Sequence, residues 1–121
     1  MEIIIGKSII KQIVDGVNKN GIIKSDLIDQ LQALRNEFIE HKDPLVTKIL
    51  RLLCEYLENT GLFNINLMSE VEEGEEMPDI SEDFNEMKAN LLYFIELITD
   101  PSNKYNREEL EALKFRLMDL V

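Results

Sequence analysis

The chain has 121 residues, of which 45% are hydrophobic and 31% charged, a composition that favours one ordered domain and argues against extended disorder. Its net charge of −11 is uneven, since residues 1–60 sum to −1 and residues 61–121 to −10. A strongly acidic protein repels phosphate backbones and anionic lipids, so binding to nucleic acid or to a membrane surface is not expected. The charge favours a basic protein as partner, or serves solubility alone.

The cysteine content and the N-terminal segment bear on the compartment. Cys54 is the single cysteine, so no intrachain disulfide is possible. Its neighbours are apolar, so we expect its side chain to be buried and to act as a small hydrophobic group. The first six residues lack the basic region of a signal peptide, and no window of 18 apolar residues occurs. We therefore expect a cytoplasmic protein.

The first predicted element is a helix over residues 3–18, because apolar residues recur there at the spacing of one helix face. Asn18, Asn20 and Gly21 follow as stop signals. Ile3–Ile5 fit either the start of this helix or a short extended arm, since Gly6 permits both.

A second helix is predicted to begin at Ser25, a good N-cap residue, with Asp26 complementing the helix dipole. It carries one apolar stripe and runs to about Lys42. The joint at 42–44 is tight, which implies that this helix and the next form an antiparallel hairpin.

The third helix is predicted to start at Asp43-Pro44, an N-cap residue followed by a proline whose fixed φ suits the first helical position. Gly61 is expected to end it in a left-handed conformation, with Leu62 against Leu57 in a Schellman motif. Its apolar face is wide, so we expect this helix to be central.

The helical periodicity is lost between residues 62 and 80. The acidic run there predicts a flexible loop over about 69–80 that crosses from one helical hairpin to the other. A short extra turn over 63–69 is an alternative for the beginning of this segment.

Two more helices are predicted after the loop. Ser81 is expected to cap the fourth, whose apolar residues follow the alternating three- and four-residue spacing of bundle packing. Asn106 is expected to cap the fifth, with Glu109 completing a capping box and Tyr105 against Leu110 as a hydrophobic staple.

The whole pattern predicts an all-α fold, an antiparallel helical bundle of about five helices without a sheet, formed by residues 1–121 as a single domain. Six residues are expected in its core: Phe38, Ile49, Leu52, Leu53, Phe94 and Leu117. Apolar surface beyond one small core also predicts a symmetric homodimer.

Carboxylates are the only plentiful functional groups, so a metal site is the first catalytic possibility. Glu37 and Glu40 in the second helix and Glu55 and Glu58 in the third form two E-x-x-E pairs. All-α nucleotide pyrophosphatases hold Mg²⁺ with acidic pairs on adjacent helices. A tight hairpin separates Glu55 from the level of Glu37 by roughly 9 Å, so we expect such a site only across an antiparallel homodimer.

The acidic run offers a different interpretation. Its candidate partner-binding residues are Glu72, Glu73, Glu75, Glu76 and Asp79. The leading hypothesis is a small acidic, non-enzymatic interaction protein without a cofactor, which neutralises a basic protein as immunity proteins and antitoxins do. That comparison rests on composition and shape alone. The alternative hypothesis is a metal-dependent, all-α pyrophosphatase-type hydrolase whose carboxylates bind Mg²⁺ across a homodimer.

Overall fold

The computed structural model describes residues 5–61, 63 and 84–120, and this part of the chain contains five α-helices and no strand. The helices are α1 (Lys7–Asn20), α2 (Lys24–Glu40), α3 (Pro44–Thr60), α4 (Phe84–Thr99) and α5 (Lys104–Leu120). The prediction of an all-α bundle is confirmed. The predicted loop over 69–80, the extra turn over 63–69 and the Ser81 cap lie outside the described residues, apart from Phe63.

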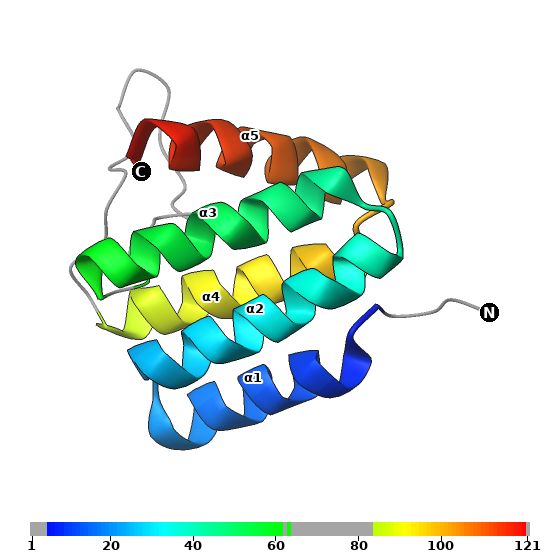
Figure 1. The fold of residues 1–121 in the computed structure, drawn as a ribbon. Coiled ribbons are helices and arrows are strands. Elements are labelled where there is room, and N and C mark those ends of the chain that lie inside the picture. Colours follow the sequence, from blue (N-terminus) through cyan, green and yellow to red (C-terminus); the bar gives the residue numbers. More distant parts are fainter. Residues whose placement is uncertain (1–4, 62, 64–83, 121) are drawn as a thin grey trace.

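Four helices lie side by side in the order α5, α3, α2, α1, and α4 lies behind them (Figure 1). α3 packs against both α2 and α5, and α1 packs against α2. α4 contacts α5 at one edge and α1 at the other, which closes the layer into a bundle. α2 and α3 run antiparallel across a short turn, as do α4 and α5, so both predicted hairpins are present (Figure 1).

One cluster of buried side chains draws on all five helices and on Phe63. Its members include every predicted core residue, none of them more than 5% exposed: Phe38, Ile49, Leu52, Leu53, Phe94 and Leu117. α3 supplies eight buried residues and is central as predicted. α4 shares this role, because Phe94 is fully buried and its ring centroid lies 6.4 Å from that of Phe63.

α1 begins at Lys7, because Gly6 precedes it in a left-handed conformation with φ 67°, so Ile5 does not start the helix, which was one of the two alternatives for this segment. This conformation favours glycine, and a Cβ at this position would also lie 2.3 Å from Leu34 Cδ1, so the end of the buried Leu34 side chain would have to shift. Ile5 precedes the helix and packs against the core. Ile3 and Ile4 lie outside the described residues.

The prediction that Ser25 caps α2 is wrong. The helix begins at Lys24, which places Ser25 inside the first turn. The N-cap residue is Ile23, and no side-chain hydrogen bond caps the helix there. The helix also ends at Glu40, two residues before the predicted end. At the other end of the hairpin, Lys24 Nζ donates to the carbonyl oxygen of Glu58 at 3.2 Å.

The predicted cap of α5 is also wrong. Asn103 caps the helix, because its Oδ1 accepts from the backbone N–H groups of Tyr105 at 3.0 Å and Asn106 at 3.3 Å. Asn106 therefore lies within the first turn, where its Nδ2 donates to the carbonyl of Asp100 at 3.1 Å. Tyr105 is 75% exposed, so it forms no staple with the buried Leu110.

The predicted ends of α3 are both present. Asp43 Oδ1 accepts from the Val46 N–H at 3.3 Å, and Pro44 is the first helical residue. Gly61 has the predicted left-handed conformation with φ 77°, but its N–H donates to the Leu57 carbonyl at 2.8 Å, which is the bond of the αL motif and not of the predicted Schellman motif. The proposed contact of Leu62 lies outside the described residues.

Candidate functional site

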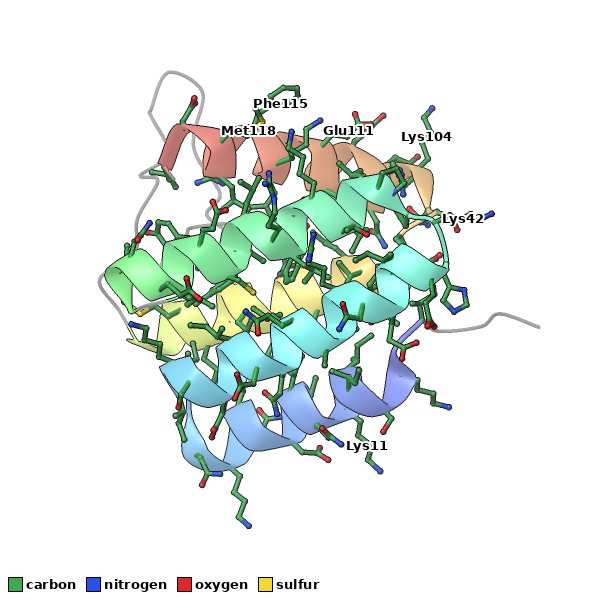
Figure 2. The ribbon with its side chains drawn as sticks, viewed as in Figure 1. Lys11, Lys42, Lys104, Glu111, Phe115 and Met118 are labelled. Atoms are coloured by element: carbon green, nitrogen blue, oxygen red, sulfur yellow. The ribbon has the colours of Figure 1, made fainter. Side chains whose placement is uncertain are left out.

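The most chemically varied cavity lies at the end of the bundle where the α2–α3 turn meets the α4–α5 turn. Its volume is about 460 Å³. Residues from both turns, together with Ile5, line it: His41, Lys42, Asp43, Thr99, Asp100, Pro101, Ser102 and Arg107. Figure 2 shows Lys42 and Lys104 at this end of the molecule. The cavity mixes cationic and anionic groups, so its use depends on how these groups are paired.

Lys42 shapes one wall of the cavity through its backbone. It has φ 57°, a left-handed conformation that L residues rarely adopt. Its N–H donates to the Ile39 carbonyl at 3.1 Å, and the Asp43 N–H donates to the Phe38 carbonyl at 3.0 Å. These two bonds form a Schellman motif at the end of α2, with a lysine where glycine is usual. The turn therefore holds about 1 kcal/mol of backbone strain.

Asp43 and Arg107 tie the two turns together. Arg107 Nη1 donates to Asp43 Oδ2 at 3.1 Å, and Nη2 donates to Oδ1 at 3.3 Å. Arg107 Nη1 also donates to the Pro101 carbonyl at 3.3 Å. The Asp43 side chain is 13% exposed and also caps α3. Because Asp43 and Arg107 bind each other, the arrangement favours a structural role over a catalytic one for this pair.

The metal-ligand candidates are not brought together within one chain. Lys24 contacts Glu58, so the start of α2 lies beside the end of α3. Glu37 lies 13 residues along α2 from Lys24, roughly 20 Å by helical rise. Glu40 and Glu58 are exposed, and Glu37 and Glu55 are half-buried. Among the described residues, no group of three or more His, Cys, Asp or Glu could hold a metal ion. Assembly across a homodimer stays a prediction.

The acidic partner-binding candidates Glu72, Glu73, Glu75, Glu76 and Asp79 lie outside the described residues. The helices before and after them in the sequence are α3 and α4, and the end of α3 and the start of α4 lie at the end of the bundle opposite the two hairpin turns (Figure 1).

Cys54 behaves as the sequence predicted, since it is buried within α3. Burial, and after it the charge of Glu58, raises the pKa of the Cys54 thiol from 9.0 to about 11. The thiolate needed for nucleophilic attack is therefore scarce at neutral pH.

A groove between α4 and α5 holds a second polar contact. Tyr93 Oη donates a hydrogen bond to Glu109 Oε2. Burial, and then this bond to a carboxylate, raise the pKa of Tyr93 to about 12. The groove has a volume of about 100 Å³, and Ala112 and Leu113 contribute to its apolar lining. The hydrogen bond between Tyr93 and Glu109 joins α4 to α5, the two helices of the second hairpin.

Sequence reasoning missed the outer face of α5. Phe115 is 61% exposed and Met118 48% exposed, although both are large apolar residues. They lie outside the buried face of α5, which is formed by Leu110, Leu113 and Leu117. That offset from the seam was the signal available in the sequence, because residues outside the buried stripe of a helix must face outwards.

No protein-family model, curated protein or solved structure matches this chain. The function must therefore be argued from the residues themselves. Within the described part of the chain, no helix combines the length and apolar character needed to cross a membrane.

Proposed function

We propose that this protein is a non-enzymatic binding protein that engages a basic protein partner through its acidic segment. One observation carries the proposal. The described residues contain all thirteen Lys and Arg of the chain together with fifteen Asp and Glu, so the helical body has a net charge of only −2. Residues 64–83 contain eight Asp and Glu and no basic residue. Most of the charge of −11 therefore belongs to one segment of 20 residues.

Such a segment cannot neutralise its charge locally. Carboxylates that repel one another are stabilised by a surface of Lys and Arg, which also gains charge-assisted hydrogen bonds. Phe63, buried against Phe94, fixes the chain immediately before the segment, and α4 starts immediately after it. The described residues on both sides of the segment therefore belong to the packed bundle, which supports a docking role for the charged residues between them.

Two features of the described residues support a binding protein over an enzyme. In the cavity between the two hairpin turns, the partly buried charges of Asp43 and Arg107 are hydrogen-bonded to each other. The raised pKa of Cys54 makes it a poor nucleophile.

The test removes the charge of the segment. A variant with Glu72, Glu73, Glu75 and Glu76 changed to Gln and Asp79 to Asn should bind poly-L-lysine at least about tenfold more weakly at low ionic strength, because five charges are lost from the contact. Titration calorimetry measures the affinity. The wild-type affinity should also fall as salt is added.

A matched control separates the segment from net charge. Asp15, Asp26 and Asp29 changed to Asn and Glu40 and Glu96 changed to Gln remove the same five charges from exposed positions of the helical body. This control should bind nearly as well as wild type. Equal weakening in both variants would mean that only total charge matters, and the proposal would then be wrong.

A further inference from the structure

The outward side of α5 carries a continuous row of exposed residues. Its members, which we call the α5 ridge, follow four- and three-residue spacing along the helix: Lys104, Glu108, Glu111, Phe115 and Met118. This spacing keeps them on one face, opposite the buried leucines. Figure 2 shows Glu111, Phe115 and Met118 on the side of α5 away from α3, whereas Lys11 marks the opposite side of the bundle.

The ridge brings two exposed apolar side chains together. Five large apolar side chains are exposed among the described residues, and two of them, Phe115 and Met118, belong to the ridge. Exposed apolar groups grouped on one helix face, with polar residues around them, are a common feature of binding surfaces. Phe115 and Met118 are one helical turn apart, so a single partner helix can contact both.

The charges around these apolar residues identify the chemistry of the partner. Glu108, Glu111 and Asp119 are exposed on the same face as Phe115. The ring of Phe115 already attracts a cation, since Lys114 Nζ lies 4.7 Å from its centroid. Lys104 stands at the far end of the ridge. The middle and end of the ridge therefore combine apolar contact with an excess of carboxylates.

The same charges disfavour a second copy of this chain as the occupant. An antiparallel copy that overlaps the whole ridge places Glu111 against Glu111 of the copy. A parallel copy places every carboxylate opposite its own equivalent. Like charges held this close destabilise either full overlap, and an overlap that avoids this repulsion is confined to one end of the ridge.

We propose that the α5 ridge docks a basic amphipathic helix of a protein partner. Apolar residues of that helix pack on Phe115 and Met118, and its Lys and Arg residues pair with Glu108, Glu111 and Asp119. The inference rests on the proposed function, because it gives the basic partner a second and more specific contact than the acidic segment.

The test uses two synthetic peptides of 18 residues with the same Lys and Leu content. In one peptide the leucines recur at i, i+3, i+4 and i+7, and in the other their order is scrambled so that no apolar face forms. Fluorescence anisotropy at low ionic strength should give an affinity at least about tenfold higher for the amphipathic peptide, because only it can use the apolar part of the ridge.

Variants then locate the contact. Phe115→Gln with Met118→Gln should remove the tenfold preference and leave the scrambled peptide unaffected. The matched control is Ile39→Gln, since Ile39 on α2 is 48% exposed, as is Met118. Its peptide affinities should equal those of wild type. Glu108→Gln with Glu111→Gln should weaken binding of the amphipathic peptide and reduce the dependence of its affinity on salt concentration.

The outcomes separate this inference from the function on which it rests. If both peptides bind equally and binding depends on the charges of residues 64–83, the ridge is not the contact, and the proposed function stands. If neither peptide binds at low ionic strength, both proposals are wrong. If neutralisation of the segment leaves both the preference and the two affinities unchanged, the ridge is supported, and the segment's assigned role is wrong.

Two further measurements on the free protein test other occupants. Sedimentation of wild type at twice 14.1 kDa, reduced to the monomer mass by the Phe115 and Met118 changes, would assign the ridge to a second copy. A fall in the melting temperature of that variant beyond the Ile39→Gln control would mean that the chain's own residues cover the ridge. Either result overturns the proposal.

Discussion

Two glycines of the first helical segment have opposite roles. Gly6 adopts φ 67° directly before α1, and a Cβ there would meet Leu34 Cδ1 at 2.3 Å. Gly16 lies inside α1, and a Cβ there would have no neighbour within 4 Å. The left-handed backbone favours glycine at the first position, and glycine at the second adds only flexibility to the unfolded chain.

These roles give opposite expectations for the same substitution. Gly6→Ala should lower the free energy of unfolding by about 2 kcal/mol or more, since left-handed strain adds to the clash. Gly16→Ala should raise it by about 0.5–1 kcal/mol through helix propensity. Urea unfolding followed by circular dichroism measures both. A Gly6→Ala protein as stable as wild type would contradict the geometry at this position.

The Cys54 thiol makes the free energy of unfolding depend on pH in the alkaline range. Its pKa is raised from 9.0 to about 11, first by burial and then by the charge of Glu58. Between these values the unfolded chain releases the thiol proton while the folded chain retains it, so stability falls as pH rises. The loss should reach about 2 kcal/mol by pH 11, and the contribution is fully present below pH 9.

Cys54→Ala provides the comparison, because it retains the tyrosines that also titrate in this range. Urea unfolding of both proteins from pH 8 to 11 should show a shallower decline in the variant. The native wild-type thiol should also react slowly with a disulfide reagent at pH 8. Rapid modification without unfolding would show that the thiol is not held as described.

Among the elements, the α2–α3 turn and the start of α5 depend on one another through Asp43. Its carboxylate caps α3 and also accepts two hydrogen bonds from Arg107, 64 residues further along the chain. One side chain therefore fixes a helix start and the register between two hairpins.

A double-mutant cycle measures both contributions. Arg107→Ala should lower the free energy of unfolding by about 1 kcal/mol, since its ion pair with Asp43 is bidentate but partly exposed. Asp43→Ala should cost about 1 kcal/mol more, because the cap is also lost. In the double variant the two losses should not add, leaving a coupling energy of about 1 kcal/mol. Full additivity, measured by thermal and urea unfolding, would show that the ion pair contributes nothing.

The sequence predicted the existence of all five helices and the six core residues, because apolar periodicity is a local signal read along the chain. Helix ends were less predictable where two good caps compete. Asn103 and Asn106 can both cap a helix, and the short turn from Asp100 to Asn103 selects the earlier one. Asp43-Pro44 had no such competitor.

The candidate site was much harder to predict. The Asp43–Arg107 pair joins distant parts of the chain, and no local pattern marks it. Lys42 adopts a left-handed φ where the sequence has no glycine to signal it. Phe115 and Met118 were missed because an apolar residue in an amphipathic helix is usually assigned to the core, and only their offset from the leucine seam placed them outside.

Across the whole molecule, the acidic groups of the helical body are spread rather than gathered. Glu37 and Glu40 lie at one end of the α2–α3 hairpin, and Glu58 lies at the other beside Lys24. This separation bears on the alternative hypothesis of a Mg²⁺-dependent hydrolase, which requires a second chain to complete the site.

Metal addition tests that alternative. Millimolar Mg²⁺ should change the melting temperature no more than NaCl of matched ionic strength, because a ligand stabilises a protein only by occupying a specific native site. Differential scanning calorimetry measures the shift. A rise specific to Mg²⁺ that disappears in Glu55→Gln would instead support carboxylate ligands shared across a homodimer.

The separation of charge also gives the molecule an electric dipole moment. The sequence between α3 and α4 contains eight carboxylates and no basic residue over 64–83, whereas the opposite end of the bundle carries the exposed Lys42 and Lys104. A positively charged body diffusing nearby exerts a torque on such a dipole before any contact forms. The acidic end would then arrive first in most encounters, so the charge pattern acts on the rate and orientation of collision even where it adds little to final affinity.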